Sequence, residues 1–206
     1  MKILEIEIQF SISALKSFVD DVENNLNISI NNIDSKEIDD VFDRVFYDIE
    51  KIDIIELNII NLHKAIEKLV TKIAKYFGEN NNLYKYHEIN KVLLDNGINI
   101  KNLNYFISYR ELVSVSNKIK HGSLTRFCSE RYNEILIKDS LLENINFNYK
   151  INNEANKGIF YPKELISNSC FNFENIQSFY QRVKTESFLF VEELSKKLIE
   201  IKKAHN

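Results

Sequence analysis

The residues best suited to chemistry in this chain lie on one predicted helix, between Tyr109 and Gly122. Arg110, Asn117 and His121 recur at intervals of seven and four residues, which places them in one angular sector of a helix. Asn117 and His121 are one turn apart, so an amide and an imidazole can converge on one ligand at the helix end. Arg110 lies roughly 16 Å farther back, so it can share a phosphate with His121 only across a two-fold axis between two copies.

Two lysines, Lys118 and Lys120, flank this sector and bring positive charge to the same helix end. The segment also has the features of an ordinary helix terminus. Cations in the last turn complement the helix dipole, and Gly122 suits the left-handed conformation that follows many helices. The residues therefore support both a ligand site and a simple C-cap.

We expect helices to position these residues, because apolar residues along most of the chain recur at helical spacing. The chain has one Pro and four Gly in 206 residues, which disfavours a turn-rich sandwich or barrel. Apolar residues at helical spacing predict helices over 35–51, with Ser35 as N-cap, over 55–77, ended by Gly78, over 84–94, from Asn102 to His121, and from Asn172 onward. We expect an all-α helical bundle of about five to seven helices.

Minor β-structure is expected at two places. Leu4, Ile6, Ile8 and Phe10 alternate with polar residues, which favours a short strand, although the first turns of a helix are an alternative. The segments 145–151 and 158–162 are consistent with a β-hairpin that has a polar tip. We interpret 123–170 as an insertion in a single helical domain that spans 1–206.

Composition and charge narrow the function classes. The protein has a mass of 24.3 kDa, 44% hydrophobic and 28% charged residues, as ordinary globular proteins do. A net charge of -3 and a pI near 5.9 give no global positive field, so any nucleic-acid binding must be local. Cys128 and Cys170 are far apart and have no CxxC spacing, which argues against a zinc site and a disulfide framework.

Several other classes are disfavoured by missing motifs. The sequence has no phosphate-binding loop, dinucleotide fingerprint, HExxH motif, EF-hand loop or GxSxG elbow. We therefore expect neither a cofactor nor a metal. No apolar run approaches the roughly 18 to 20 residues that span a bilayer, and Glu5 and Glu7 interrupt the apolar N-terminal segment. We expect no membrane association and a cytoplasmic location.

The segment Asn117-Lys118-Ile119-Lys120-His121-Gly122 resembles the signature of the HEPN superfamily. That superfamily contains small helical proteins of toxin-antitoxin, abortive-infection and RNA-processing systems. Many members are metal-independent ribonucleases that dimerise, so that two copies of an Arg-(four to six residues)-His motif form one composite site. The resemblance covers one helix directly, and it is consistent with the expected bundle.

This resemblance implies roles for the residues that match the motif. His121 would transfer protons and Asn117 would orient the imidazole or a phosphate oxygen, while the RNA 2′-hydroxyl attacks the adjacent phosphate. The family pattern places an arginine where this chain has Ser116. Either Arg110, Lys118 or Lys120 substitutes for it, or the site is degenerate.

The functional expectation follows from these observations. The leading hypothesis is a HEPN-like ribonuclease, or toxin-like component, of a bacterial defence or stress system. It would act as a homodimer on an RNA substrate, with a cognate antitoxin or defence partner. The alternative is a catalytically inactive helical dimerisation or partner-binding module of the same fold.

Overall fold

The computed structural model describes residues 2–36, 41–77, 86–120 and 173–204, and within these ranges every regular element is a helix. The all-α prediction is therefore confirmed as a helical bundle for the described part of the chain. The elements are α1 (Lys2–Asp34), α2 (Val41–Lys75), α3 (Tyr86–Asp95), the short 3-10 helix η1 (Ile100–Asn102), α4 (Phe106–Lys120) and α7 (Phe173–Ala204).

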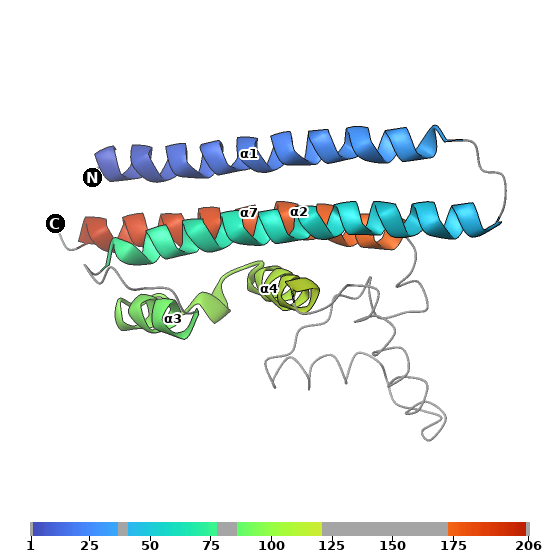
Figure 1. Cartoon of the computed structure of the whole chain (residues 1–206). Coiled ribbons are helices and arrows are strands. Elements are labelled where there is room, and N and C mark those ends of the chain that lie inside the picture. The colour runs from blue at the N-terminus through green and yellow to red at the C-terminus, as the bar shows by residue number, and fades with distance from the viewer. Residues whose placement is uncertain (1, 37–40, 78–85, 121–172, 205–206) are drawn as a thin grey trace, which may run out of the picture.

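The helices are arranged in three layers (Figure 1). The long helices α2 and α7 lie side by side and form the central layer, and their mutual contact is extensive. On one side α1 packs on α2 and α7 along their length, and on the other side α4 packs across both. The shorter helix α3 lies beside α4 and contacts α2. The end of α4 is thus separated from α1 by the central layer.

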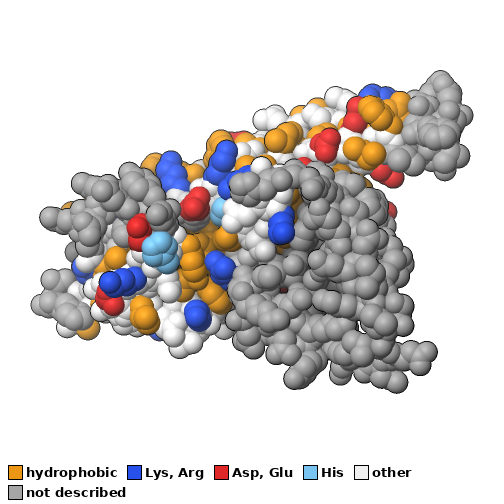
Figure 2. All heavy atoms as spheres, turned by 60° about the horizontal axis from the view of Figure 1, so that its bottom comes forward, with side chains coloured by type: hydrophobic (Ala, Val, Ile, Leu, Met, Phe, Trp, Pro, Cys, Tyr) orange, Lys and Arg blue, Asp and Glu red, His pale blue; other side chains and the backbone are white. Residues whose placement is uncertain are grey.

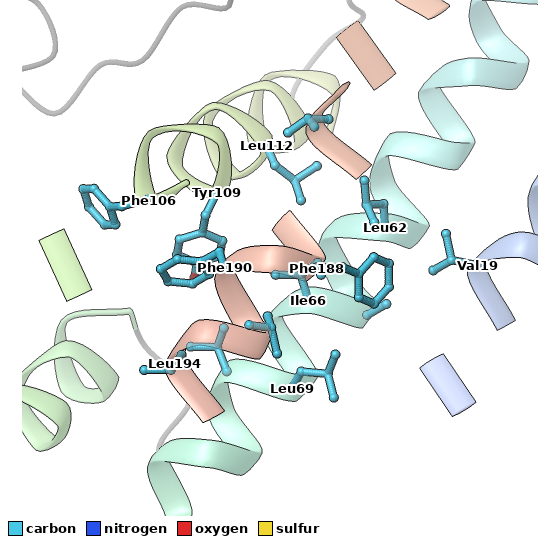
Figure 3. Close-up of a cluster of buried hydrophobic side chains, with 14 of the residues drawn as sticks. Val19, Leu62, Ile66, Leu69, Phe106, Tyr109, Leu112, Phe188, Phe190 and Leu194 are labelled. Carbon is cyan, nitrogen blue, oxygen red and sulfur yellow. The ribbon is translucent and has the colours of Figure 1, made fainter. Parts of the chain in front are cut away.

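The core follows from the spacing of apolar residues on α2. Its inward residues alternate steps of three and four, which keeps them on one face of a helix. Each is at most 2% exposed, and the row consists of Ile52, Ile55, Ile59, Leu62, Ile66, Leu69 and Ile73. Figure 3 shows part of the cluster, in which Val19 of α1, Leu62 of α2, Phe188 of α7 and Leu112 of α4 converge from four helices. One continuous core therefore holds all three layers.

Ion pairs fix the position of α1 on α7. Lys184 of α7 contacts the carboxylates of both Asp20 and Glu23 on α1. Farther along the same contact, Nζ of Lys16 lies 2.9 Å from Oε1 of Glu192. The acidic neighbours raise the pKa of Lys184 against the opposing effect of its burial, so its ammonium stays charged. These pairs set the register between the two helices, because long side chains reach only specific partners.

The strand predicted at 4–10 is wrong, because α1 is one helix from Lys2 to Asp34. Ile8 is 2% exposed and Leu4 is partly buried, so this pair at i, i+4 faces the core. Ile6 and Phe10, also at i, i+4, are 67% and 73% exposed on the opposite side. The alternating pattern therefore arises from two apolar faces of one helix, and the pattern alone does not distinguish them from a strand.

The two helices predicted over 35–51 and 55–77 are also wrong as separate elements, because α2 continues from Val41 to Lys75. Ile52 is 2% exposed and bridges them in the same row of core residues. Ser35 does not cap the second helix. Its N–H donates to the carbonyl of Asn31 at 3.0 Å, so it closes the C-terminal end of α1 instead.

The connection into α4 is well defined. The predicted short helix is confirmed as α3, and Gly97 ends it with φ 83°, a left-handed conformation that glycine adopts without a steric cost. The N–H of Gly97 donates to Leu94 and that of Ile98 to Leu93, which satisfies two carbonyls at the helix end. After η1, Tyr105 has φ 61° and turns the chain into α4.

Three sequence predictions fall on residues outside the described ranges: the hairpin at 145–162, the insertion at 123–170 and the helix end at Gly78. They stay predictions. None of the helices in the described ranges is long and apolar enough to cross a membrane.

Candidate functional site

Helix α4 presents the candidate residues on its last turn, and its inward face determines which of them reach solvent. Phe106, Tyr109, Leu112, Val115 and Ile119 are buried against α2 and α7 at helical spacing. The ring of Tyr109 stacks on Phe190 of α7, with centroids 4.8 Å apart and planes 7° from parallel. This packing fixes the rotation of α4 about its own axis, and so fixes the direction in which residues 116–120 point.

Ser116 faces the core. It is 0% exposed, and its hydroxyl has no hydrogen-bond partner in the described part of the chain. Leu112, one turn earlier, and Ile119, nearly one turn later, are buried on the same side. The position where the resembled motif has an arginine is therefore an interior position of this helix. An arginine at this position would bury its charged guanidinium away from water and without a partner, which costs much folding free energy.

Asn117 and Lys118 lie on the outer side of the same turn, and both are exposed. Asn117 precedes Lys120 by three residues, so their side chains lie on neighbouring parts of the helix surface. His121 follows directly but lies outside the described residues. Its convergence with Asn117 stays a prediction.

Lys120, in the last turn of α4, contacts a buried histidine of α2. Its Nζ lies 3.2 Å from Nδ1 of His63, which comes from α2. His63 is 4% exposed, and its burial, followed by the charge of Lys120, lowers its pKa to about 4. The imidazole is therefore neutral at pH 7, so Nδ1 accepts a hydrogen bond from the ammonium and the ring proton lies on Nε2. A buried neutral ring thus orients an exposed cation.

Arg110 lies at the other end of α4 and has a different role. Its guanidinium carbon is 4.4 Å from the centroid of the Tyr86 ring, a cation–π contact that joins α4 to α3. Ten residues separate it from Lys120, about 15 Å along the helix. Within one chain the structure therefore does not bring Arg110 to the last turn, as helical spacing predicts.

A second polar cluster joins α4 to α7. Nη2 of Arg182 lies 2.8 Å from Oε2 of Glu111, and Nη1 lies 3.0 Å from Oε2 of Glu186. Ser108 donates to the same Glu186 carboxylate. Because one guanidinium bridges two carboxylates and every member has a partner, the cluster holds α4 in place, and we assign it no chemistry of its own.

The partners of the candidate residues were not predicted from the sequence. His63 is buried beside the apolar row of α2, at 4% exposure. Its contact with Lys120 joins residues 57 positions apart, and only the register between α2 and α4 brings them together. The Arg182 cluster depends in the same way on the register between α4 and α7.

The charge on this side of the molecule is dispersed. Figure 2 shows the face to which α3 and α4 belong, where Lys and Arg side chains lie scattered among acidic, apolar and His side chains. In the described ranges no group of three or more His, Cys, Asp or Glu residues is placed to hold a metal ion. Comparison of the chain with family models, with curated proteins and with solved structures gives no match.

Proposed function

We propose that this chain is a HEPN-like, metal-independent ribonuclease whose active site lies at the C-terminal end of α4. The observation that carries the proposal is the contact between Lys120 and His63, with Nζ and Nδ1 3.2 Å apart. It supplies a fixed cation next to His121 and one turn from Asn117. The motif that this segment resembles needs such a cation, and Ser116 does not provide it.

Lys120 fits the role of the substituted cation better than the other two candidates do. Arg110 is committed to Tyr86 at the opposite end of α4. Lys118 lies on the exposed, outer side of the helix. Lys120 is exposed enough to meet a phosphate, yet one of its hydrogen bonds goes to a buried acceptor. An ammonium held in one direction stabilises developing negative charge better than a freely rotating one.

The reaction that these residues would support is transesterification. His121 takes the proton from a ribose 2′-hydroxyl, and that oxygen attacks the adjacent phosphorus. The bond from phosphorus to the 5′ oxygen breaks, and the imidazolium of His121 gives the proton to the departing oxygen. The products are a 2′,3′-cyclic phosphate and a 5′-hydroxyl. Lys120 stabilises the negative charge of the phosphorane, and Asn117 orients a phosphate oxygen or the imidazole.

The test is cleavage of total RNA by purified protein in EDTA, with analysis of the product ends for 2′,3′-cyclic phosphate. We expect His121→Ala to abolish cleavage and Lys120→Ala to slow it about 100-fold or more. Lys101→Ala is the matched control, because Lys101 is an exposed lysine on η1 and is remote from this turn. Equal cutting by all four proteins, or none by the wild type, would contradict the proposal.

A toxin-like role in a bacterial defence or stress system is the biological setting of this proposal. Expression of the wild type in a bacterial host should arrest growth, and His121→Ala should relieve the arrest. A cognate antitoxin would be recognised as a co-expressed neighbour that restores growth.

A second candidate is an inactive helical module that binds a partner through the same fold. The burial of Ser116 favours it, because this helix has no room for the arginine of the motif on that face. An intact, folded protein that cuts no RNA under any of the conditions above would support this reading.

A further inference from the structure

Helix α1 carries large apolar side chains on the side that faces away from the core. Ile3, Ile6, Phe10 and Phe18 are 81%, 67%, 73% and 50% exposed, and Ile28 near the other end is 58% exposed. Single exposed apolar residues are common on protein surfaces, whereas a row on one helix face marks an interaction site. We call the row Ile3, Ile6, Phe10, Ala14 and Phe18 the outer face of α1.

The rest of the described chain leaves this face uncovered. The packing partners of α1 are α2 and α7, and both contact its inner side. Helix α1 forms the outermost layer, while α3 and α4 lie beyond the opposite side of the central layer (Figure 1).

Two phenylalanines of the outer face lie symmetrically about a small residue. Ile6, Phe10, Ala14 and Phe18 follow one another at steps of four, which makes one continuous ridge along the helix. Ala14 is exposed and lies midway between the two phenylalanines. A two-fold axis at Ala14 places Phe10 of one copy beside Phe18 of the other, twice, while the small side chain lets the two helices approach closely. A self-complementary ridge of this kind fits a second copy of the same chain.

The area of the outer face is in the range that a dimer needs. With about 200 Å² for a large apolar side chain, the exposed fractions of Ile3, Ile6, Phe10 and Phe18 amount to roughly 500 Å² per copy. Two copies together would therefore bury roughly 1,000 Å², which is about the lower limit for a specific protein–protein interface.

The negative charge of α1 argues against an anionic membrane or a nucleic acid as the binding partner of the outer face. Helix α1 has two lysines against six acidic residues, so it repels anionic membranes and nucleic acid. In a dimer the acids around the ridge are partly neutralised within each chain. Glu7 pairs with Lys72 at 3.1 Å, and Lys184 contacts both Asp20 and Glu23.

We propose that α1 is a dimerisation helix and that two copies of this chain pack α1 against α1 about a two-fold axis at Ala14. Because α4 lies on the other side of the central layer, the two candidate sites then face away from each other. Each site works with the residues of its own chain. This arrangement differs from the composite site that the resemblance implies, in which two copies meet at the motif.

Sedimentation velocity of the purified chain tests the dimer. We expect the wild type at twice the chain mass of 24.3 kDa and the Phe10→Glu/Phe18→Glu variant at the chain mass. Leu57→Glu is the control, because Leu57 is an apolar residue of α2 with 53% exposure, and it should remain dimeric. Circular dichroism of each variant checks that the helices are intact. A monomeric wild type at tens of micromolar, or a dimer that persists in the double variant, would overturn the proposal.

Cysteine cross-linking tests the axis independently of any disruptive substitution. In a Cys128→Ser/Cys170→Ser background, Ala14→Cys places its two copies at the axis, so mild oxidation should link them. Asn25→Cys is the control on the same helix. It lies 11 residues away, so its two copies are separated by about 33 Å in this arrangement and should not link. Equal linking at both positions, or none at Ala14→Cys in a dimeric sample, would rule out the axis at Ala14.

Discussion

Lys120 and His63 face each other across the contact between α4 and α2, with Nζ and Nδ1 3.2 Å apart. The contact requires a neutral imidazole, because a protonated ring has no acceptor to offer and would repel the ammonium. Burial and the nearby cation together lower the pKa of His63 to about 4, so the neutral form persists well below pH 7. The orientation of Lys120 therefore depends on the protonation state of a residue that is far away in the sequence.

Stability should fall as the pH decreases from about 6.5 to 4. An unfolded histidine titrates near 6.5, so in this window the unfolded chain binds a proton at His63 that the folded chain does not. Stability is thus fully present above the unfolded pKa, and the loss is complete near pH 4. The contribution of His63 is up to about 3 kcal/mol. Urea unfolding at several pH values measures it, and His63→Gln should flatten this part of the curve.

The exposed His87 of α3 provides the control for that measurement. His87→Gln should keep the steep dependence of the wild type, whereas His63→Gln should not. If both variants keep it, carboxylates rather than His63 account for the acid sensitivity.

Arg182→Leu should destabilise the protein by about 2 to 3 kcal/mol, because it leaves Glu111 and Glu186 close together without their shared cation. The side chain of Glu111 is only 11% exposed, so water compensates poorly. Replacement of all three residues with leucine should restore much of the loss, since no partly buried charge then remains. Urea unfolding at constant pH and ionic strength is the measurement.

An exposed ion pair on α7 is the control for the stability loss expected of Arg182→Leu. Lys197 and Glu200 are 3.0 Å apart on the surface of α7, and Lys197→Ala should cost less than about 0.5 kcal/mol. A similar cost for Arg182→Leu would mean that solvent screens the cluster as well as it screens the surface.

The helical character of the long helices could be predicted because their core residues repeat along the sequence, although the break predicted between residues 51 and 55 of α2 was wrong. Ile59, Leu62, Ile66 and Leu69 carry the spacing of α2 without a break, and the row on α7 is similarly regular. The strand prediction at 4–10 failed because some apolar residues there do not face the core. Phe10 is 73% exposed, and its position opposite Ile8 produced the alternation that resembles a strand.

The sequence predicts only those features of the candidate site that depend on α4 alone. Spacing along α4 correctly separates Arg110 from the last turn, since both positions lie on the same rigid element. The partner of Lys120 depends instead on how α2 and α4 slide past each other, which the packing of many side chains decides together. The inward direction of Ser116 depends on the rotation of α4, which Tyr109 and Phe190 fix through a contact between distant segments.

Gly97→Ala should cost about 1 to 2 kcal/mol. Gly97 has φ +83°, and a Cβ atom added there meets nothing within 4 Å, so the cost comes from the left-handed backbone and not from a clash. Gly97→Asn should cost less, because asparagine tolerates this conformation better than alanine does. Thermal unfolding should therefore rank the wild type first, Asn second and Ala third. Equal midpoints for alanine and glycine would show that the turn after α3 does not need a positive φ.

Ser116→Arg tests whether this helix can accept the arginine of the motif that it resembles. Because Ser116 is 0% exposed, the substitution places a long charged side chain in the core, and we expect a loss of at least about 3 kcal/mol. Asn117→Arg is the matched control one position away, on the exposed side, and should stay within about 0.5 kcal/mol of the wild type. Ser116→Ala should be neutral or stabilising, because it removes a buried hydroxyl that has no hydrogen-bond partner within the described ranges. A stable Ser116→Arg variant with faster RNA cleavage would instead show that this face of α4 opens toward the site, and the cation assigned to Lys120 would then be unnecessary.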